Sequence, residues 1–197
     1  MLDLESSFEE LSSLEIAKYL VLPINASLDK FKDKILKLKF PLWLKLNSSE
    51  HKASLGGVEL CESFEELDKK LRSFQKNFPG KKFIVQENVS GLELIAGLKQ
   101  DKTFGKVLLI GAGGSYTEIL QDKTFLILPS TKQDVEQSIK NLKIFRIIKK
   151  KFYKLNKLVD LINKFSQLKI EEADLNPIIL NNQQAIIVDA RISIQED

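Results

Sequence analysis

The stretch EEADLNPIILNNQQAIIVDAR, residues 171–191, contains two apolar runs separated by the polar residues NNQQ at 181–184. Two such runs joined by a short polar connection predict a β-hairpin. Residues whose numbers sum to the same total then face each other, so Asn176 pairs with Asp189 and Asp174 with Arg191. Because side chains alternate between the two faces of a strand, we expect all four to project from one side.

This row of side chains has two interpretations. Carboxylate and amide oxygens suit a hard cation such as Mg²⁺, which commonly takes one or two protein ligands while substrate phosphates complete its shell. Asn176 and Asp189 are therefore candidate metal ligands. The alternative is an exposed Asp–Arg pair beside a turn, which is common and contributes little to stability. The hairpin alone favours this alternative.

The composition of the chain limits its size class, its partners and its compartment. The 197 residues suffice for one large domain or two lobes, and 30 basic and 27 acidic residues give a net charge of only +3. Total charge therefore does not favour a nucleic-acid partner. The single cysteine, Cys61, excludes an internal disulfide and is typical of a reducing compartment. No apolar run is long enough to cross a bilayer, and the acidic start MLDLESSFEELSS does not resemble a signal peptide. We expect a cytoplasmic protein without a membrane partner.

Periodicity predicts an α+β protein with two lobes. In residues 1–80 we expect N-terminal helices, strands at 41–46 and 56–60, and a helix that begins at the capping box of Ser63 and Glu66 and ends at Pro79-Gly80. Residues 81–197 form the second lobe, with strands at 82–86, 92–99, 106–110 and 125–129, helices at 131–145 and 155–168, and the hairpin. Short turns between neighbouring strands predict a mostly antiparallel sheet there.

The stretch KVLLIGAGGSYTEIL, residues 106–120, has Gly111, Gly113 and Gly114 after a buried strand. The last glycine of a dinucleotide-binding G-x-G-x-x-G would fall at Tyr116, and the Gly-Lys-Ser/Thr ending of a phosphate loop is missing. Two readings remain, a backbone cradle for a phosphate and a tight turn without a ligand.

Three further features carry candidate chemistry. Lys45, inside the apolar strand LWLKL, must bring its ammonium to an anion or to the edge of a cleft. His51 is the single histidine, which excludes multi-histidine metal sites; a solvated loop histidine is the plain alternative. The basic stretch IKNLKIFRIIKKKFYKLNK, residues 139–157, has helical apolar spacing, which favours an amphipathic segment with its basic side in water over RNA or membrane binding.

Taken in order, PLWLKL…HKASLGGVEL, FIVQENVSGLELIAGLKQDKTFGKVLLIGAGGSYTEIL and EEADLNPIIL…AIIVDARI resemble the ATP-grasp β subunit, or β-like domain, of ADP-forming acyl-CoA (acetyl-CoA) synthetases. These enzymes are related to the succinyl-CoA synthetase β chain. The resemblance implies an ATP-grasp fold whose two lobes clamp ATP or ADP with Mg²⁺. The implied contacts are Lys45 to the phosphates, Asn176 and Asp189 to Mg²⁺, and, around the nucleotide, Gln86, Glu87, Asn88, Val89, Glu93, Gly113, Gly114 and Glu118.

The resemblance also implies an activity. The family are ADP-forming acid–thiol ligases, which couple acyl-CoA cleavage to ATP formation through an acyl phosphate and a phosphohistidine. A CoA-binding α subunit carrying a phosphohistidine would be the partner, without which this chain is inactive. His51 matches a histidine that accepts the phosphoryl group, so His51 and Lys45 are the candidate catalytic residues.

The chain departs from the family at three places. The segment from Lys45 to His51 is shorter, Leu126 stands where an arginine is common, and IIKKKFYK (147–154) replaces a Leu-x-Gly-Tyr-Arg-Gly stretch. The alternative interpretation is therefore a non-catalytic ATP-grasp-like protein that binds nucleotide or acts as a scaffold.

Overall fold

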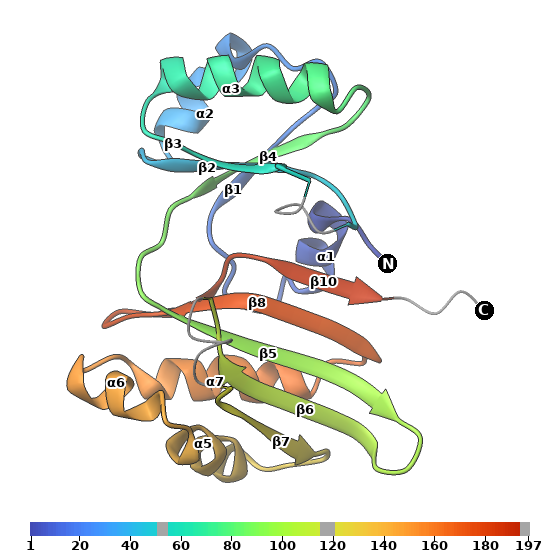
Figure 1. The fold of residues 1–197 in the computed structure, drawn as a ribbon, viewed down its shortest axis with the longest axis vertical. Helices are drawn as coiled ribbons and strands as arrows, with labels where there is room; N and C mark the ends of the chain where they lie inside the picture. Colours follow the sequence, from blue (N-terminus) through green and yellow to red (C-terminus); the bar gives the residue numbers. More distant parts are fainter. Residues whose placement is uncertain (51–54, 115–120, 194–197) are drawn as a thin grey trace. The chain divides into compact units, whose positions relative to one another are not determined.

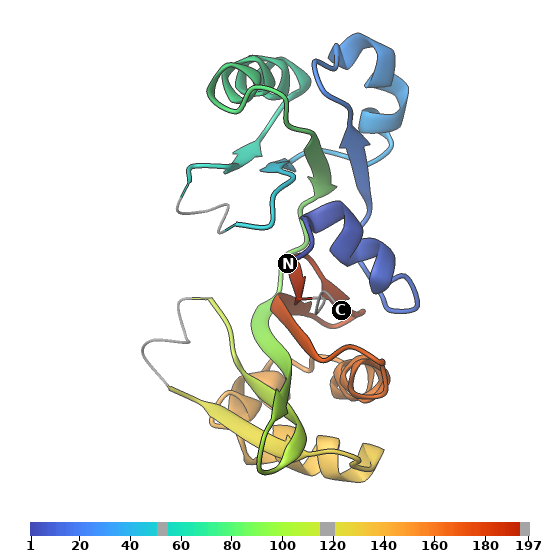
Figure 2. The same ribbon diagram turned by 90° about the vertical axis from the view of Figure 1, so that its right-hand side faces the viewer.

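The computed structural model describes residues 1–50, 55–114 and 121–193. The chain divides into two compact units (Figures 1 and 2). The N-terminal unit contains residues 3–6 and 17–89, and the C-terminal unit contains residues 1–2, 7–16 and 90–197. Each unit has its own sheet and its own helices, which confirms the expected α+β class with two lobes. Helix α1 (Leu4–Glu10) is shared between them.

The N-terminal unit is built on a four-stranded antiparallel sheet of order β1-β4-β2-β3. The strands are β1 (Tyr19–Leu22), β2 (Leu42–Leu46), β3 (Val58–Cys61) and β4 (Phe83–Glu87). The helical elements η1 (Leu28–Phe31), α2 (Lys32–Leu36) and α3 (Phe64–Asn77) cover one face of this sheet (Figure 1). Helix α3 begins as predicted, because the Ser63 side chain accepts a hydrogen bond from Glu66 N, and it buries Leu67, Leu71 and Phe74.

The division between the units differs from the boundary expected at Pro79-Gly80. Strand β4 lies between β1 and β2 and pairs with both, so the N-terminal unit extends to Val89. The Pro79-Gly80 turn therefore connects α3 to β4 within one unit. Sequence alone could not show this, because the turn signal is the same whether the next strand returns to the old sheet or starts a new one.

The C-terminal unit has an antiparallel sheet of order β10-β8-β5-β6-β7, in which β9 also pairs with β8. Its strands are β5 (Leu92–Asp101), β6 (Gly105–Ala112), β7 (Lys123–Ile127), β8 (Glu172–Leu180), β9 (Ala185–Ile187) and β10 (Ala190–Ser193). Helices α5 (Lys132–Asn141), α6 (Phe145–Lys150) and α7 (Leu155–Ser166) pack on one face (Figures 1 and 2). We call the other face the open face.

The side chains of β5 alternate between the covered face and the open face of the sheet. Leu92, Leu94, Ala96 and Leu98 are buried, whereas the residues between them are half-buried or exposed. The predicted antiparallel sheet is thus confirmed. The helix expected at 131–145 ends at Asn141 and is followed by the separate, short α6. No helix in the described parts of the chain is long and apolar enough to cross a membrane.

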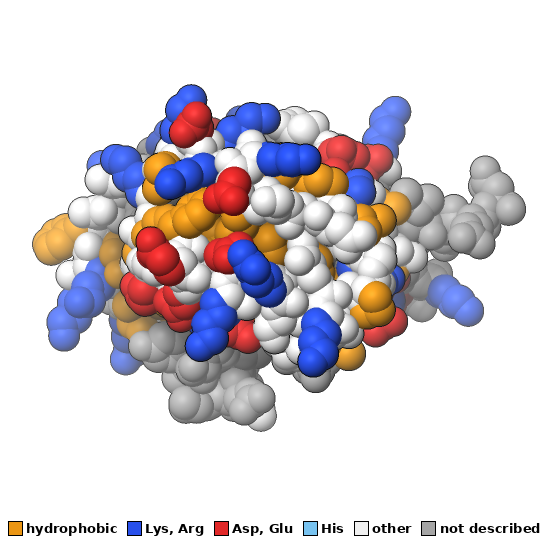
Figure 3. All heavy atoms as spheres, turned by 90° about the horizontal axis from the view of Figure 1, so that it is seen from above, with side chains coloured by type: hydrophobic (Ala, Val, Ile, Leu, Met, Phe, Trp, Pro, Cys, Tyr) orange, Lys and Arg blue, Asp and Glu red, His pale blue; other side chains and the backbone are white. Residues whose placement is uncertain are grey.

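The outer surface of the N-terminal unit, seen from the side of α3, carries side chains of both charges (Figure 3). Basic and acidic groups are interspersed around a strip of hydrophobic side chains. Within this unit, Lys32 Nζ lies 5.5 Å from the centre of the Phe64 ring. Because the charges alternate, this surface does not present a field of one sign.

Candidate functional site

The C-terminal hairpin has the predicted register. Arg191 pairs with Asp174, and on the other side of the predicted pair Ile178 faces Ile187. Asn176 N donates a hydrogen bond to Asp189 O at 3.1 Å. The connection is the expected one, since the N–H of residue 181 donates to the carbonyl of residue 184 at 3.0 Å. Asn176 on β8 therefore lies opposite Asp189, which lies between β9 and β10.

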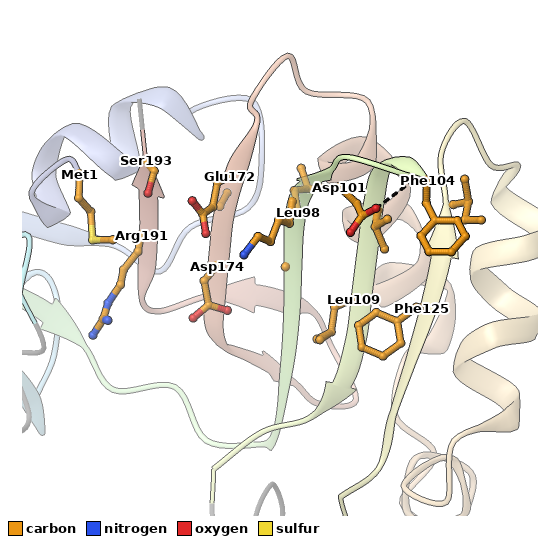
Figure 4. Close-up of a pocket in the computed structure, with 15 residues that line it drawn as sticks. Met1, Leu98, Asp101, Phe104, Leu109, Phe125, Glu172, Asp174, Arg191 and Ser193 are labelled. Carbon is orange, nitrogen blue, oxygen red and sulfur yellow. Dashed lines mark hydrogen bonds between the residues drawn. The ribbon is translucent and has the colours of Figure 1, made fainter. Parts of the chain in front are cut away.

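The burial of β8 shows which face these side chains occupy. Glu172, Asp174 and Asn176 are exposed, whereas Ala173 and Leu175 are buried. Figure 4 shows Glu172 and Asp174 on β8 beside Arg191 on β10. The side chains of Asp174, Asn176 and Arg191 thus lie on the open face of the sheet, as predicted, and we call them the polar row.

The donor set at the hairpin fits a hard divalent cation only in part. Asn176 supplies an amide oxygen and Asp189 a carboxylate, and Asp189 Oδ1 also accepts a hydrogen bond from Ala190 N at 2.9 Å. No group of three or more His, Cys, Asp and Glu side chains arranged to hold a metal occurs among the described residues. Two oxygen ligands suit a cation whose shell is completed by phosphates and water, as Mg²⁺ often is.

The glycine turn packs directly on Glu93 of β5. Gly113 N donates to Glu93 O at 2.9 Å, and a Cβ at Gly113 would lie 2.9 Å from Leu94 N. Gly114 has φ +56°, and a Cβ there would lie 1.8 Å from Glu93 Oε2. These glycines are thus required by close approach and by a left-handed backbone. The structure brings Glu93, Gly113 and Gly114 together, whereas Glu118 lies outside the described residues.

Lys45 and Gln86 form a buried pair in the sheet of the N-terminal unit. Lys45 is 6% exposed and Gln86 0%, and Lys45 Nζ donates to Gln86 Oε1 at 2.6 Å. Gln86 Nε2 in turn donates to Ala17 O at 3.3 Å. A neutral amide orients an ammonium without cancelling its charge. His51, the other candidate catalytic residue, lies outside the described residues.

The side chains of the predicted hinge also bind the protein itself. Glu87 Oε1 accepts a hydrogen bond from Lys18 N at 2.9 Å, and Asn88 Oδ1 accepts one from Trp43 Nε1 at 3.0 Å. With Gln86 held by Lys45, three of the four hinge side chains have protein partners. Lys18 and Trp43 were missed by sequence reasoning. The position of Trp43, two residues before Lys45 and so on the same side of β2, was the available signal.

A pocket of about 750 Å³ lies on the open face beside the polar row, and we call it the sheet-face pocket (Figure 4). Asp174 and Arg191 line one side. The apolar side chains of Leu109 and Phe125 line another, and Phe125 is 58% exposed. This pocket could not be predicted from sequence, because its walls come from five strands and the N-terminus.

These features define a two-unit α+β protein, with a buried lysine that donates to a glutamine in one unit. The other unit carries the Asn176–Asp189 pair and a glycine turn that packs on Glu93. A family model described as an ATP-grasp domain matches residues 18–194, and the chain belongs to this family. The resemblance seen in the sequence and the expected ATP-grasp fold are thereby confirmed.

Two curated relatives are similar to this chain in sequence. The β subunit of ADP-forming acetate–CoA ligase I from Pyrococcus furiosus is 31% identical over 176 residues, which cover 79% of this chain and 76% of that subunit. ADP-forming acetate–CoA ligase I from Archaeoglobus fulgidus is 30% identical over 207 residues, covering 95% of this chain. The match spans only 30% of the Archaeoglobus protein's length.

A solved structure shares the fold over almost the whole chain. Acetyl-coenzyme A synthetase 1 of Candidatus Korarchaeum cryptofilum, in complex with coenzyme A and Mg-AMPPCP, gives a TM-score of 0.81 at 26% identity. The match covers 98% of this chain and 92% of that chain. In that protein a phosphohistidine segment points towards the nucleotide-binding site.

Proposed function

We propose that this chain is the nucleotide-binding β subunit of an ADP-forming acyl-CoA (acetyl-CoA) synthetase. The observation that carries the proposal is the backbone pairing of Asn176 with Asp189 in a chain that belongs to the ATP-grasp family. The proposal is supported by relatives named as β subunits of ADP-forming acetate–CoA ligases and by a similar structure that holds a magnesium nucleotide.

In this proposal the candidate residues of the two units have different roles in binding the nucleotide. Asn176 and Asp189 hold Mg²⁺, which neutralises charge on the phosphates when bound. Lys45, oriented by Gln86, adds a compact positive charge. The hinge from Gln86 to Val89 offers its backbone groups to the base. Glu87 and Glu93 contact the base and the ribose in this proposal. Gly113 and Gly114 lie near the phosphates, with Glu118 close by.

The reaction moves a phosphoryl group between a histidine and ADP. The bond from phosphorus to the histidine nitrogen breaks while a β-phosphate oxygen of ADP forms the new bond to phosphorus. The imidazole keeps the electron pair of the broken bond. Such a transfer depends on in-line positioning and charge neutralisation more than on covalent help from side chains. His51 is the proposed phosphoryl carrier of this chain, and a CoA-binding α subunit with its own phosphohistidine carries the acyl chemistry.

A non-catalytic, nucleotide-binding or scaffolding role is the second candidate. Leu126 on β7 and the IIKKKFYK stretch favour it, because both replace residues that the resembled enzymes commonly carry. Steady-state ATP formation with a CoA-binding partner, acyl-CoA, ADP and phosphate separates the two. The enzyme forms ATP, and the scaffold does not.

Calorimetry with ADP and Mg²⁺ tests the metal assignment. Asp189→Ala is expected to abolish magnesium-dependent binding. Glu172→Ala removes a carboxylate from an exposed position of β8, the strand that carries Asn176, and this variant is expected to bind as the unaltered chain does. Equal affinities of both variants and the unaltered chain would show that Asp189 is not a ligand. Acid-labile ³²P on His51, formed with the partner, acyl-CoA and phosphate, tests the proposed carrier.

A further inference from the structure

One segment of the C-terminal unit concentrates positive charge. Residues 137–159 contain no Asp or Glu, and their charge of +8 leaves the rest of the chain at −5. Total charge, which argued against a polyanionic partner, therefore conceals a strong local asymmetry. The basic residues are Lys140, Lys143, Arg146, Lys149, Lys150, Lys151, Lys154 and Lys157.

Most of these cations are exposed and lack an acidic partner. Lys140 pairs with Glu136 at 2.7 Å. The six cations from residue 146 to residue 157 are all exposed, and no carboxylate in the described parts of the chain lies within 4.0 Å of any of them. Unpaired cations on one surface attract a polyanion and release its counterions when they bind it.

The segment has helical apolar spacing, but it does not form one continuous helix. Helix α6 ends at Lys150, and Phe152 adopts φ +54°, a left-handed conformation that is uncommon for an aromatic residue. The chain then enters α7 at Leu155. This break turns the Phe152 ring outward, where it is 85% exposed.

The break also shapes a groove of about 690 Å³ along α5, α6 and the start of α7. Three aromatic residues line it, Phe145, Phe152 and Tyr153. Lys149 and Lys154 line it as well. The groove therefore combines planar rings with exposed ammonium groups, the two components by which proteins hold single strands of nucleic acid.

We propose that this basic groove binds single-stranded nucleic acid, with the lysines on the phosphates and Phe152 stacked on a base. The inference is independent of the proposed nucleotide chemistry, because none of the groove residues belongs to the site described above.

Other polyanions fit the groove less well. Phe152 is the one exposed large hydrophobic residue of this segment, so a membrane would gain little from insertion. Helix α6 has only six residues and buries Ile148, so it cannot lie in the major groove of a duplex. An acidic peptide would meet the cations but would leave the Phe152 ring without a stacking partner.

Fluorescence anisotropy with a labelled uridine 12-mer tests the proposal on the full chain. If four to six phosphates are neutralised, the affinity is expected to fall about 50- to 300-fold between 50 and 200 mM salt. Lys149→Glu/Lys150→Glu/Lys151→Glu should abolish most binding. Phe152→Asn suits a left-handed backbone and removes the ring, so affinity should fall about 5- to 150-fold without loss of folding.

The matched control is Lys30→Glu/Lys34→Glu/Lys37→Glu, which makes the same charge change at exposed positions of the N-terminal unit. It should bind like the unaltered chain. An equal loss in this control, no measurable binding, or stronger binding to polyglutamate or to phosphatidylserine vesicles than to the oligonucleotide would overturn the proposal.

Discussion

Replacing Gln86 with Leu is expected to destabilise the protein through Lys45 rather than through lost packing. The hydrogen bond from Lys45 Nζ is 2.6 Å long, and both side chains are buried. Removing one partner of a buried hydrogen bond to a charged group costs about 1.5–3 kcal/mol. Lys45→Met leaves a neutral carbonyl oxygen without this donor and costs about 1–2 kcal/mol. Replacing both by apolar residues is nearly neutral by comparison, so the costs should not add.

A double-mutant cycle in urea measures this coupling. The single tryptophan, Trp43, lies on β2 and donates to Asn88, so its fluorescence reports unfolding of the N-terminal unit. The coupling energy between Gln86→Leu and Lys45→Met is expected to be about 1–3 kcal/mol. Gln75→Leu, which removes a hydrogen bond from Gln75 Nε2 to a backbone carbonyl, should add independently to Lys45→Met. Strict additivity of the first pair would refute the reasoning.

Three further predictions follow from single contacts. Burial raises the pKa of Cys61 to about 11, so iodoacetamide at pH 8 should modify this thiol only after unfolding, as mass spectrometry would show. Thr131→Ala removes the cap of α5 and should cost about 1 kcal/mol at neutral pH in urea unfolding. The hydrogen bond from the Thr131 hydroxyl is the largest cause of the lowered pKa of Asp134. The stability that this bond contributes is therefore fully present above the pKa of Asp134 in the unfolded chain. The difference in unfolding free energy between the unaltered chain and Thr131→Ala should shrink as the pH falls through the lowered pKa of the folded state. Gly114→Ala should lower the melting temperature, because its Cβ meets Glu93 Oε2 and its φ is positive; an unchanged value in calorimetry would show that the turn can shift.

Local rules predicted the parts of the fold that depend on neighbouring residues in sequence. The hairpin register followed from counting across a four-residue turn, and the helices expected to begin at Ser63 and Thr131 do so, each with its N-cap side chain accepting a backbone N–H. Each of these features is decided within a few residues by the alternation of a strand or by the free N–H groups of a first helical turn.

Contacts between residues far apart in the sequence could not be predicted from it. The bond between Lys45 and Gln86 joins residues 41 apart, and it depends on β4 inserting between β1 and β2. Apolar patterns of these strands are compatible with other strand orders, so the partner of Lys45 could not be chosen in advance. The short helix α6 and the left-handed backbone at Phe152 lie between the two helices expected at 131–145 and 155–168, and the apolar spacing of this stretch did not indicate either feature.

The open face of the C-terminal sheet carries both candidate site residues and the sheet-face pocket. On this face Gly97 lies between Asp174 on β8 and Leu109 on β6, and the residue without a side chain leaves room for the sheet-face pocket. Asp174 and Arg191 form the pair next to Asn176 and Asp189 and also line that pocket. Asp174 and Arg191 therefore lie between the polar Asn176–Asp189 pair and the apolar side chains of the sheet-face pocket. A change at Asp174 is expected to affect both the Asn176–Asp189 pair and the sheet-face pocket. Glu172, the next residue of β8 on the same face, lines the pocket but is not adjacent to Asn176. Glu172→Ala is therefore the control for the proposed metal site.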